Sequence, residues 1–201
     1  MANWSTLSIC EVALDDIPQI TEVWYRAFST PHNLELFPDT PAVRSWWNKN
    51  ISYDLVNRPY QKYIKVVDAA CPGEIIAYAK WDLQPDECGE RFLPWHPESN
   101  AELCAQLFGG IELQRKSLMR GCRHFYLDML ATNPEHGRRG AASLLVHWGC
   151  DIADRNGITI YVSSSDQAVG LYQKFGFKLV EGLDDIPEGS TPMIREPCLT
   201  D

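Results

Sequence analysis

The sequence lacks the features that mark membrane proteins and secreted proteins. No part of its 201 residues approaches about 18 uninterrupted apolar residues, and the N-terminus has no basic start followed by an apolar run. Neither a membrane span nor a signal peptide is therefore predicted. The seven cysteines are odd in number and show no CxxC or Cys/His ligand spacing, which indicates neither a disulfide framework nor a zinc site. We expect reduced thiols, no metal and a cytoplasmic location.

Basic residues are also scarce. The chain has 18 Lys and Arg residues against 27 Asp and Glu residues, a formal net charge of -9 and a sequence pI of about 5.0. Binding to nucleic acid depends on clustered Lys and Arg that neutralise phosphates, so no nucleic-acid partner is expected. An acidic surface tolerates cationic substrates such as amines, although solubility alone is the simpler explanation of the charge.

What the sequence does have is the composition of an ordinary folded domain. Hydrophobic residues make up 45% of the chain, charged residues make up 22%, and there are seven tryptophans. Such a chain can bury a substantial core, and its length fits one domain better than two. Because no internal repeat or interdomain linker is visible, we expect a single domain over residues 1–201.

The first half of the chain predicts strands and helices in alternation. Alternating apolar residues predict a strand over 7–14, and helical spacing behind an acidic first turn predicts a helix over 15–28. A second helix is expected around 41–51. Two β-branched and aromatic runs, 61–69 and 74–84, flank the turn sequence "ACPG" and are typical of an antiparallel hairpin.

The second half begins with a polar segment, 85–99, which is a candidate lid or substrate wall. The region 100–119 is helical and forms either one bent helix or two short ones, because two adjacent glycines interrupt it. The elements expected after it are strands over 124–132, 158–164, 177–182 and 191–197 and helices over 139–156 and 167–175. Strands that alternate with helices favour parallel pairing in this half, so the fold class is α/β with a mixed sheet flanked by helices.

One glycine-rich turn stands out at the end of the predicted strand 124–132. A turn that leads from a strand into a helix aims several backbone N–H groups at one point, where the helix dipole adds positive charge. Gly137 and Gly140 permit unusual backbone angles, and Arg138 and Arg139 add charge suited to phosphate. The turn matches neither a Walker A motif nor GxGxxG. Taken alone, it fits a pyrophosphate site and a purely structural turn equally well.

Two segments together are more specific. The sequence "LDMLATNPEHGRRGAASLLV", followed by "VGLYQKFGFKLVEG", resembles the GNAT superfamily of acyl-CoA-dependent N-acetyltransferases over roughly residues 120–182. The resemblance implies a mixed central sheet of about six to seven strands, flanked by helices and splayed between the fourth and fifth strands. It also implies acetyl-CoA as the cofactor.

The resemblance implies which residues hold that cofactor. The turn and the helix start would bind the pyrophosphate, and the main chain at the end of the preceding strand would pair with the pantetheine arm. At Gly137, this chain departs from the Gln or Arg that is usual in the family, and Ser165 stands where an Asn is common. The candidate cofactor-binding residues are Leu130, Ala131, Thr132, Gly137, Arg138, Arg139, Gly140, Ala141, Ala142, Ser143 and Ser165.

Two residues are candidates for the chemistry of acetyl transfer. The resemblance implies that Tyr172 donates a proton to the departing thiolate, and the alternative is that its ring simply packs the last helix. Asp128 lies on one face of the strand before the turn and either accepts the proton of the amine or fixes a neighbouring element. His136 is more simply a solvated loop histidine. Five aromatic residues fit either an acceptor pocket or the core, namely Trp46, Trp47, Trp81, Phe92 and Trp95.

The function expected from these observations is transfer of the acetyl group of acetyl-CoA to a primary amine of a small molecule by direct attack. The alternative is a GNAT-fold protein without acetyltransferase activity, either an acyl-CoA-binding regulator or an enzyme of a different reaction. Neither a membrane nor a nucleic acid is an expected partner, and the protein is expected to be a monomer or a homodimer.

Overall fold

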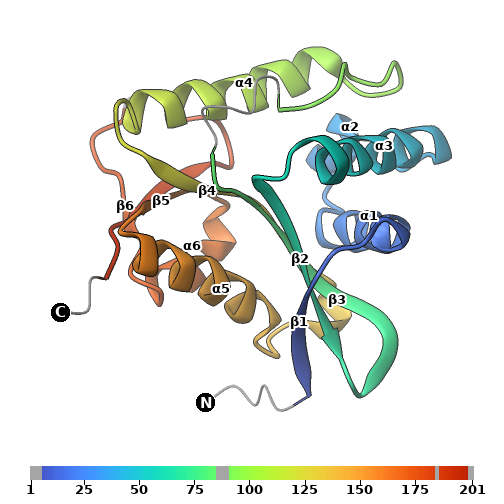
Figure 1. Ribbon diagram of the computed structural model, residues 1–201. Helices are drawn as coiled ribbons and strands as arrows, with labels where there is room; N and C mark the ends of the chain where they lie inside the picture. Colours follow the sequence, from blue (N-terminus) through green and yellow to red (C-terminus); the bar gives the residue numbers. More distant parts are fainter. Residues whose placement is uncertain (1–5, 85–90, 184–185, 199–201) are drawn as a thin grey trace.

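A single mixed sheet organises the described part of the protein (Figure 1). The computed structural model describes residues 6–84, 91–183 and 186–198. The seven strands of these residues follow the spatial order β1-β2-β3-β4-β5-β7-β6. Their bounds are β1 (Leu7–Glu11), β2 (Gln61–Asp68), β3 (Cys71–Asp82), β4 (His124–Thr132), β5 (Thr159–Ser164), β6 (Lys178–Leu179) and β7 (Thr191–Arg195).

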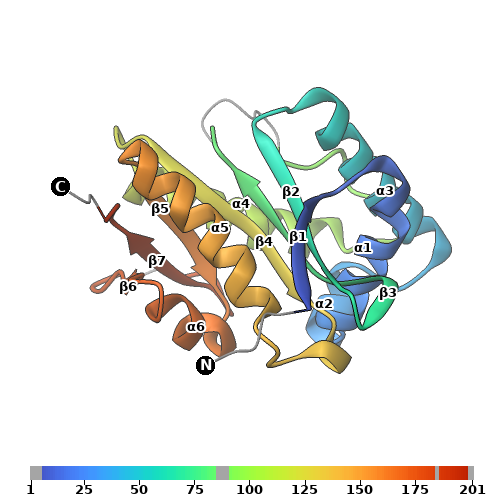
Figure 2. The same cartoon turned by 60° about the horizontal axis from the view of Figure 1, so that its bottom comes forward.

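Helices cover both faces of this sheet. Figure 2 shows α5 lying across one face with α6 beside it, whereas α1 and α3 cover the other face. No helix of the described residues is long and apolar enough to cross a membrane. The helices are α1 (Ile17–Ala27), α2 (Pro31–Leu36), α3 (Pro41–Asn57), α4 (Ala101–Leu118), α5 (Ala141–Asn156) and α6 (Val169–Gln173), with short 3₁₀ turns at Leu14–Asp16, Pro134–His136 and Asp166–Ala168.

The side chains of β3 show why the sheet needs helices on both faces. Successive side chains of a strand point to opposite faces. Ala77, Ala79 and Trp81 are buried in the core that α5 covers, whereas Tyr78 is buried in the core formed with α1 and α3. A strand that is buried on both faces carries a nearly continuous apolar run, which is the pattern that predicted it.

The structure confirms the mixed sheet and most of the predicted elements. The strand predicted over 124–132 has the same bounds as β4, and the region 100–119 forms one helix, α4, despite its two glycines. The six-residue α2 was not predicted, because it is too short to show a periodic pattern. The parallel arrangement expected throughout the second half is wrong beyond β5. There, β7 lies between β5 and β6 and runs antiparallel to both.

The splay expected between the fourth and fifth strands is present. Parallel pairing of β4 with β5 ends where Leu127 faces Val162. Pairing of β4 with β3 on its other side continues to Thr132. The second half of β4 therefore has an open edge on the side of β5.

A β-bulge marks the residue at which β4 leaves β5. Lys80 of β3 pairs with Met129, and the next residue, Trp81, pairs with Leu127. Asp128 is therefore an extra residue in β4. A bulge bends its strand and increases the local twist, which accounts for the separation of β4 from β5 immediately beyond this point.

The distance between α5 and the sheet depends on a glycine. A Cβ atom at Gly149 would lie 2.2 Å from the Cζ2 atom of Trp81, far inside van der Waals contact. The indole of Trp81 is fully buried, and its Nε1 donates a hydrogen bond of 3.3 Å to the carbonyl oxygen of Leu145. The ring therefore has no space into which it can withdraw. Glycine at this position lets α5 lie directly on β3.

We expect Gly149→Ala to lower the free energy of unfolding by about 1–3 kcal/mol, because the new methyl group overpacks the contact with Trp81. The matched control is Gly109→Ala in α4, where a Cβ meets nothing within 4 Å. That substitution should raise the free energy of unfolding by about 0.5–1 kcal/mol, because alanine favours the helix. Urea denaturation measures both effects, and equal effects would contradict the close approach.

Candidate active site

A cavity of about 410 Å³ lies where β4 and β5 separate. Residues of α1, α2, α4, β4, β5 and α6 contribute to its wall. Four of the residues predicted from the sequence line it, namely Asp128, Leu130, Ser165 and Tyr172. The splay thus brings the two candidate catalytic side chains next to part of the candidate cofactor edge.

Aromatic and aliphatic side chains form most of the cavity wall. Besides Tyr172, the Trp, Phe and Tyr residues of the wall are Trp24, Phe28, Phe37, Phe108 and Tyr126. The sequence predicted either an acceptor pocket or the core for five other aromatic residues, and none of these five is among the described residues that line the cavity. Trp46, Trp47, Phe92 and Trp95 pack in the core formed with α1 and α3, and Trp81 packs beneath α5. The interpretation of these five residues as core is therefore confirmed.

Tyr172 combines packing with access to the cavity. Its ring centroid lies 5.4 Å from that of Phe177, and only 4% of the residue is exposed. Burial raises the pKa of its hydroxyl above the ordinary value near 10, so the hydroxyl is protonated at neutral pH. Within the described ranges, no group hydrogen-bonds to this hydroxyl. It therefore has a proton to donate to a molecule in the cavity.

The carboxylate of Asp128 is held by two buried cations. Its Oδ2 lies 3.1 Å from Nζ of Lys80, and its Oδ1 is ion-paired with Arg91. Nζ of Lys80 also lies 2.8 Å from Oδ2 of Asp54, which accepts a hydrogen bond of 2.7 Å from the hydroxyl of Tyr63. Charges of opposite sign alternate through this network, so each buried charge has a partner.

These ion pairs decide the acidity of Asp128. Burial alone would raise the pKa of its carboxyl, but the positive charges of Arg91 and Lys80 outweigh that effect and lower the pKa. A carboxylate with a lowered pKa accepts a proton weakly. The arrangement favours the alternative in which Asp128 fixes neighbouring elements over its role as the base.

Sequence reasoning missed Arg91 and Lys80. Arg91 belongs to the segment 85–99, of which residues 85–90 lie outside the described residues. Since Arg91 lines the cavity, the described part of this segment contributes to the wall. Lys80 did carry a signal, because a lysine inside the otherwise apolar run of β3 implies a buried partner of opposite charge.

The turn between β4 and α5 presents a row of backbone N–H groups. Gly140 has a φ of 95° and Arg138 has a φ of 59°, so both lie in the left-handed region. In the part of the chain that the structure describes, no backbone carbonyl accepts from the N–H groups of Arg138, Arg139 or Gly140. The first three N–H groups of α5, at residues 141–143, have no acceptor within the helix. Together with the helix dipole, these groups suit a pyrophosphate.

The two arginines of the turn differ in their surroundings. Arg139 is ion-paired with the buried carboxylate of Asp68, and its Nη1 lies 3.1 Å from Nδ1 of His136. Arg138 is exposed. The N–H of Gly137 donates to the carbonyl oxygen of Pro134, and a Cβ at this position would lie 3.1 Å from that oxygen. Arg138 is therefore the better placed of the two arginines to replace the side chain that Gly137 lacks.

The open edge of β4 presents main-chain N–H and C=O groups that can pair with an extended ligand. The N–H of Asn133 donates to the carbonyl oxygen of Ile76 in β3, 2.9 Å away. Because main-chain groups alternate in direction along a strand, Thr132 and Leu130 direct theirs to the open edge, and Ala131 directs its own toward β3. This edge is where the resemblance implies pairing with pantetheine.

Ser165 is positioned to contribute its hydroxyl to the same cavity. It begins the 3₁₀ turn before α6, and its side chain makes no capping hydrogen bond there. Its carbonyl oxygen accepts from the N–H of Ala168 and from the hydroxyl of Ser164. Ser165 lines the cavity, and its side chain has no capping role in this turn.

A mixed sheet that is splayed beside an anion-binding turn is the architecture of the GNAT acetyltransferases. The profile of the Acetyltransferase (GNAT) family matches residues 17–177. The chain therefore belongs to this family, whose members transfer acyl groups and bind acyl-CoA.

Known proteins resemble the chain to different extents. Cysteine-rich protein 2-binding protein of Mus musculus is 33% identical over 73 residues, which make up 36% of this chain and 9% of that protein. The match thus spans a small part of that curated relative. Mosquito arylalkylamine N-acetyltransferase like 5b has a TM-score of 0.64 at 14% identity, with 95% of this chain and 100% of that chain covered. PaiA N-acetyltransferase of Thermoplasma acidophilum, in complex with coenzyme A, has a TM-score of 0.57 at 12% identity, with 95% and 99% covered. At these identities the two structures show the fold.

We expect Asp128→Asn to lower the free energy of unfolding at pH 7 by about 3–5 kcal/mol, because it leaves Arg91 and Lys80 beside a neutral amide. The lowered pKa means that this stabilisation is present above the ordinary carboxyl pKa of about 4 and is lost as the pH falls through the folded-state value. The difference between the two proteins should therefore shrink in acid.

The control for this measurement is Asp151→Asn, which removes an exposed pairing with His147 and should change the free energy of unfolding by less than about 0.5 kcal/mol. Denaturant titrations between pH 3 and pH 7 compare the variants. Equal stability of the Asp128→Asn variant and the wild type would show that the two cations do not depend on this carboxylate.

A different result is expected for Arg138→Gly. Glycine relieves the positive φ, so the free energy of unfolding should rise by about 1 kcal/mol, whereas the lost charge should weaken acetyl-CoA binding about tenfold. Arg138→Ala is the control, since it loses the charge and keeps the strained backbone. Calorimetric titration measures the affinity, and unchanged affinity in both variants would contradict a phosphate contact.

Proposed function

We propose that the protein is an N-acetyltransferase that transfers the acetyl group of acetyl-CoA to a primary amine of a small, largely apolar molecule by direct attack. The observation that carries this proposal is the position of Tyr172. Tyr172, whose hydroxyl is protonated at neutral pH, lines a cavity that residues of β4 and aromatic side chains also line.

The residues present fit acetyl-CoA. The N–H groups of residues 138–143 and the exposed Arg138 suit the pyrophosphate, and the open edge at Leu130 and Thr132 suits the amides of the pantetheine arm. When bound, acetyl-CoA supplies a thioester whose acetyl carbon accepts the amine. Ser165 offers its hydroxyl beside the same arm.

The side chains of the cavity make the attack possible in two ways. The apolar wall removes water from an entering ammonium group, which lowers the pKa of the amine and favours the neutral form that attack requires. As the C–N bond forms and the C–S bond breaks, the hydroxyl of Tyr172 donates its proton to the departing sulfur. It regains a proton from the nitrogen that has attacked. Asp128 holds Lys80 and Arg91 in the wall, and we assign it no proton transfer.

The same wall argues for a small acceptor with an apolar body. A cavity of about 410 Å³ has the volume of a small-molecule site. The rings of Trp24, Phe28, Phe37 and Phe108 offer stacking and edge contacts to an apolar group. Two acidic residues are among the described residues that line the cavity, Asp128 and Glu188. Asp128 is already paired with two cations and therefore offers no free charge to a polycationic acceptor.

Further expectations from the sequence belong to this proposal. We place the enzyme in the cytoplasm as a single domain over residues 1–201, acting as a monomer or homodimer without a nucleic-acid or membrane partner. The absence of paired cysteines supports this location, since all six cysteines within the described residues are free.

Calorimetric titration with acetyl-CoA, followed by a free-thiol assay with three amines, tests the proposed function. The amines are 2-phenylethylamine, spermidine and a short peptide with a free N-terminus. Binding and fastest thiol release with 2-phenylethylamine are expected. Release with the peptide alone would contradict a small-molecule acceptor. Binding without release would favour the alternative of an acyl-CoA-binding protein without activity, to which Gly137 and Ser165 point. No binding would contradict both.

We expect Tyr172→Phe to lower kcat about a hundredfold while the Kd for acetyl-CoA stays within twofold, because the ring remains and only the proton donor is lost. Wild-type activity should rise with pH as the amine deprotonates. Because burial raises the pKa of this hydroxyl, no decline in activity is expected at any pH up to 10. Tyr161→Phe is the control, since Tyr161 is fully buried and is not among the described residues that line the cavity. Unchanged turnover in Tyr172→Phe would remove this residue from the mechanism.

A further inference from the structure

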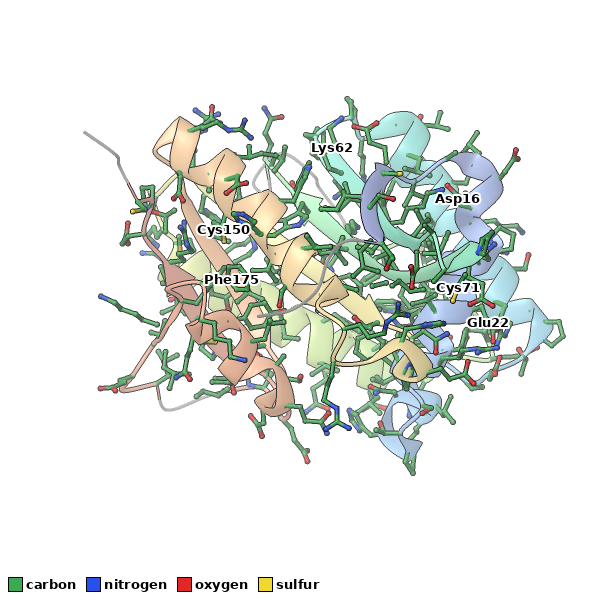
Figure 3. All side chains as sticks on the ribbon, turned by 90° about the horizontal axis from the view of Figure 1, so that it is seen from below. Asp16, Glu22, Lys62, Cys71, Cys150 and Phe175 are labelled. Carbon is green, nitrogen blue, oxygen red and sulfur yellow. The ribbon has the colours of Figure 1, made fainter. Side chains whose placement is uncertain are left out.

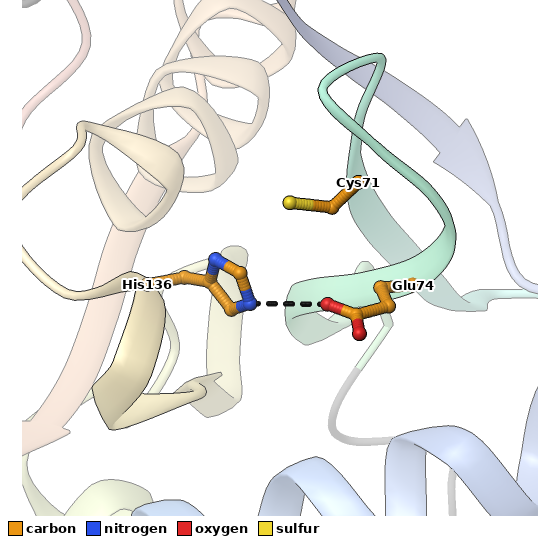
Figure 4. Close-up of side chains that lie close together, drawn as sticks. All are labelled: Cys71, Glu74 and His136. Atoms are coloured by element: carbon orange, nitrogen blue, oxygen red, sulfur yellow. Dashed lines mark hydrogen bonds and ion pairs between the residues drawn. The ribbon is translucent and has the colours of Figure 1, made fainter.

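Three side chains of residue types that commonly serve as metal ligands meet outside the candidate active site. Cys71 and Glu74 belong to the start of β3, and His136 belongs to the 3₁₀ turn that precedes the glycine-rich turn. Their ligand atoms all lie within 4.8 Å of one another. Figure 4 shows Nε2 of His136 directed at the carboxylate of Glu74, 3.2 Å from its Oε2, with the sulfur of Cys71 facing the same space.

The geometry is close to that of a tetrahedral zinc site. With bonds of about 2.0–2.3 Å to zinc, neighbouring ligand atoms lie about 3.3–3.7 Å apart. The nitrogen-to-oxygen distance of 3.2 Å already fits this spacing. The sulfur lies within 4.8 Å of both other ligand atoms. A small rotation of the Cys71 side chain would bring it to the spacing of a zinc site.

The surrounding charges also favour a divalent cation. The carboxylates of Glu74 and Asp68 carry two negative charges, and Arg139 supplies one positive charge through its ion pair with Asp68. The side chain of Asp68 is fully buried, and that of His136 is 13% exposed. Zinc binds cysteine as the thiolate, which would add a third negative charge, and one Zn²⁺ would then bring the sum of these charges to zero. Neutralising the negative charges of a partly buried cluster is favourable.

Metal binding requires one local rearrangement. Nε2 of His136 must offer its lone pair to the metal, so the ring proton moves to Nδ1. Nη1 of Arg139, now 3.1 Å from Nδ1, then loses its acceptor and shifts away, while Nη2 keeps its ion pair with Asp68. Arg139 also interacts with the side chain of Cys71, so the cost is two exchanged contacts of Arg139 beside the surface.

We propose that Cys71, Glu74 and His136 form a Zn²⁺ site, with water as the fourth ligand. The metal would tie the β2–β3 hairpin to the turn that leads into the pyrophosphate loop. Figure 3 shows Cys71 on the side of the molecule opposite to Cys150, which belongs to α5, and Phe175, which follows α6. The proposal stands independently of the acceptor and of the acetyl transfer reaction.

Cobalt substitution tests the ligands directly. The full chain, without a histidine tag and freed of metal by a chelator, is titrated with Co²⁺ and then with Zn²⁺. We expect one Co²⁺ per chain, an absorption band in the near ultraviolet from thiolate to Co²⁺, and loss of this band when Zn²⁺ displaces Co²⁺. Calorimetry should give one Zn²⁺ per chain, and Zn²⁺ should raise the melting temperature.

Cysteine variants separate this site from binding by other thiols. Cys71→Ser should abolish the thiolate band and raise the Kd for Zn²⁺ at least tenfold, whereas Cys10→Ser, at an exposed cysteine of β1, should leave both unchanged. Glu74→Gln keeps the shape of a side chain that is 62% exposed and should also weaken binding without loss of the fold. It carries the test if Cys71→Ser does not fold.

Three results would overturn the proposal. The first is a Kd for Zn²⁺ weaker than about 100 μM, which would correspond to adventitious binding only. The second is a thiolate band that survives Cys71→Ser or disappears in Cys10→Ser. The third is an equal Zn²⁺-dependent shift in melting temperature in the wild type and in the Glu74→Gln variant.

Discussion

The separation of β4 from β5 is the constraint on which the rest of the site depends. One extra residue in β4, Asp128, disrupts the ladder to β3 and bends the strand at the point where its pairing with β5 ends. The side chain of that same residue ties together Lys80 and Arg91, and through Lys80 it is coupled to Asp54 of α3. The bulge and the buried ion pairs thus hold open an edge that would otherwise close by pairing.

The open edge has consequences on both sides of the sheet. On one side, the end of β4 leads into a turn whose N–H groups converge at the start of α5, and Gly149 lets that helix lie directly on Trp81. On the other side, the gap is continuous with a cavity walled by rings from α1, α2 and α4. One strand therefore places a turn rich in N–H groups, a hydrogen-bonding edge and an apolar cavity along a single path, which is the arrangement that the proposed acyl transfer requires.

The turn between β4 and α5 also joins segments that are distant in the chain. Arg139 of the turn pairs with Asp68 at the end of β2, and His136 contacts Glu74 in β3. These contacts depend on the β2–β3 hairpin extending past the end of β4, a feature of strand register rather than of any local motif. They are the reason why ligand-type side chains meet there although their spacing in the chain shows no metal-binding pattern.

Local pattern and tertiary structure decided different parts of this protein. Periodicity, turn residues and the two GNAT-like segments were sufficient for the mixed sheet, for β4 with its exact bounds, for α5 and for the turn between them, because these features depend on residues that are close in sequence. Only the tertiary structure decided the partners of Asp128, the engagement of Arg139, the short α2, the insertion of β7 between β5 and β6, and the choice of rings that line the cavity. Most of these features depend on residues that are far apart in the sequence and close together in the fold. The local pattern of apolar and polar residues does not specify which distant side chain will pair with a buried charge or line a pocket.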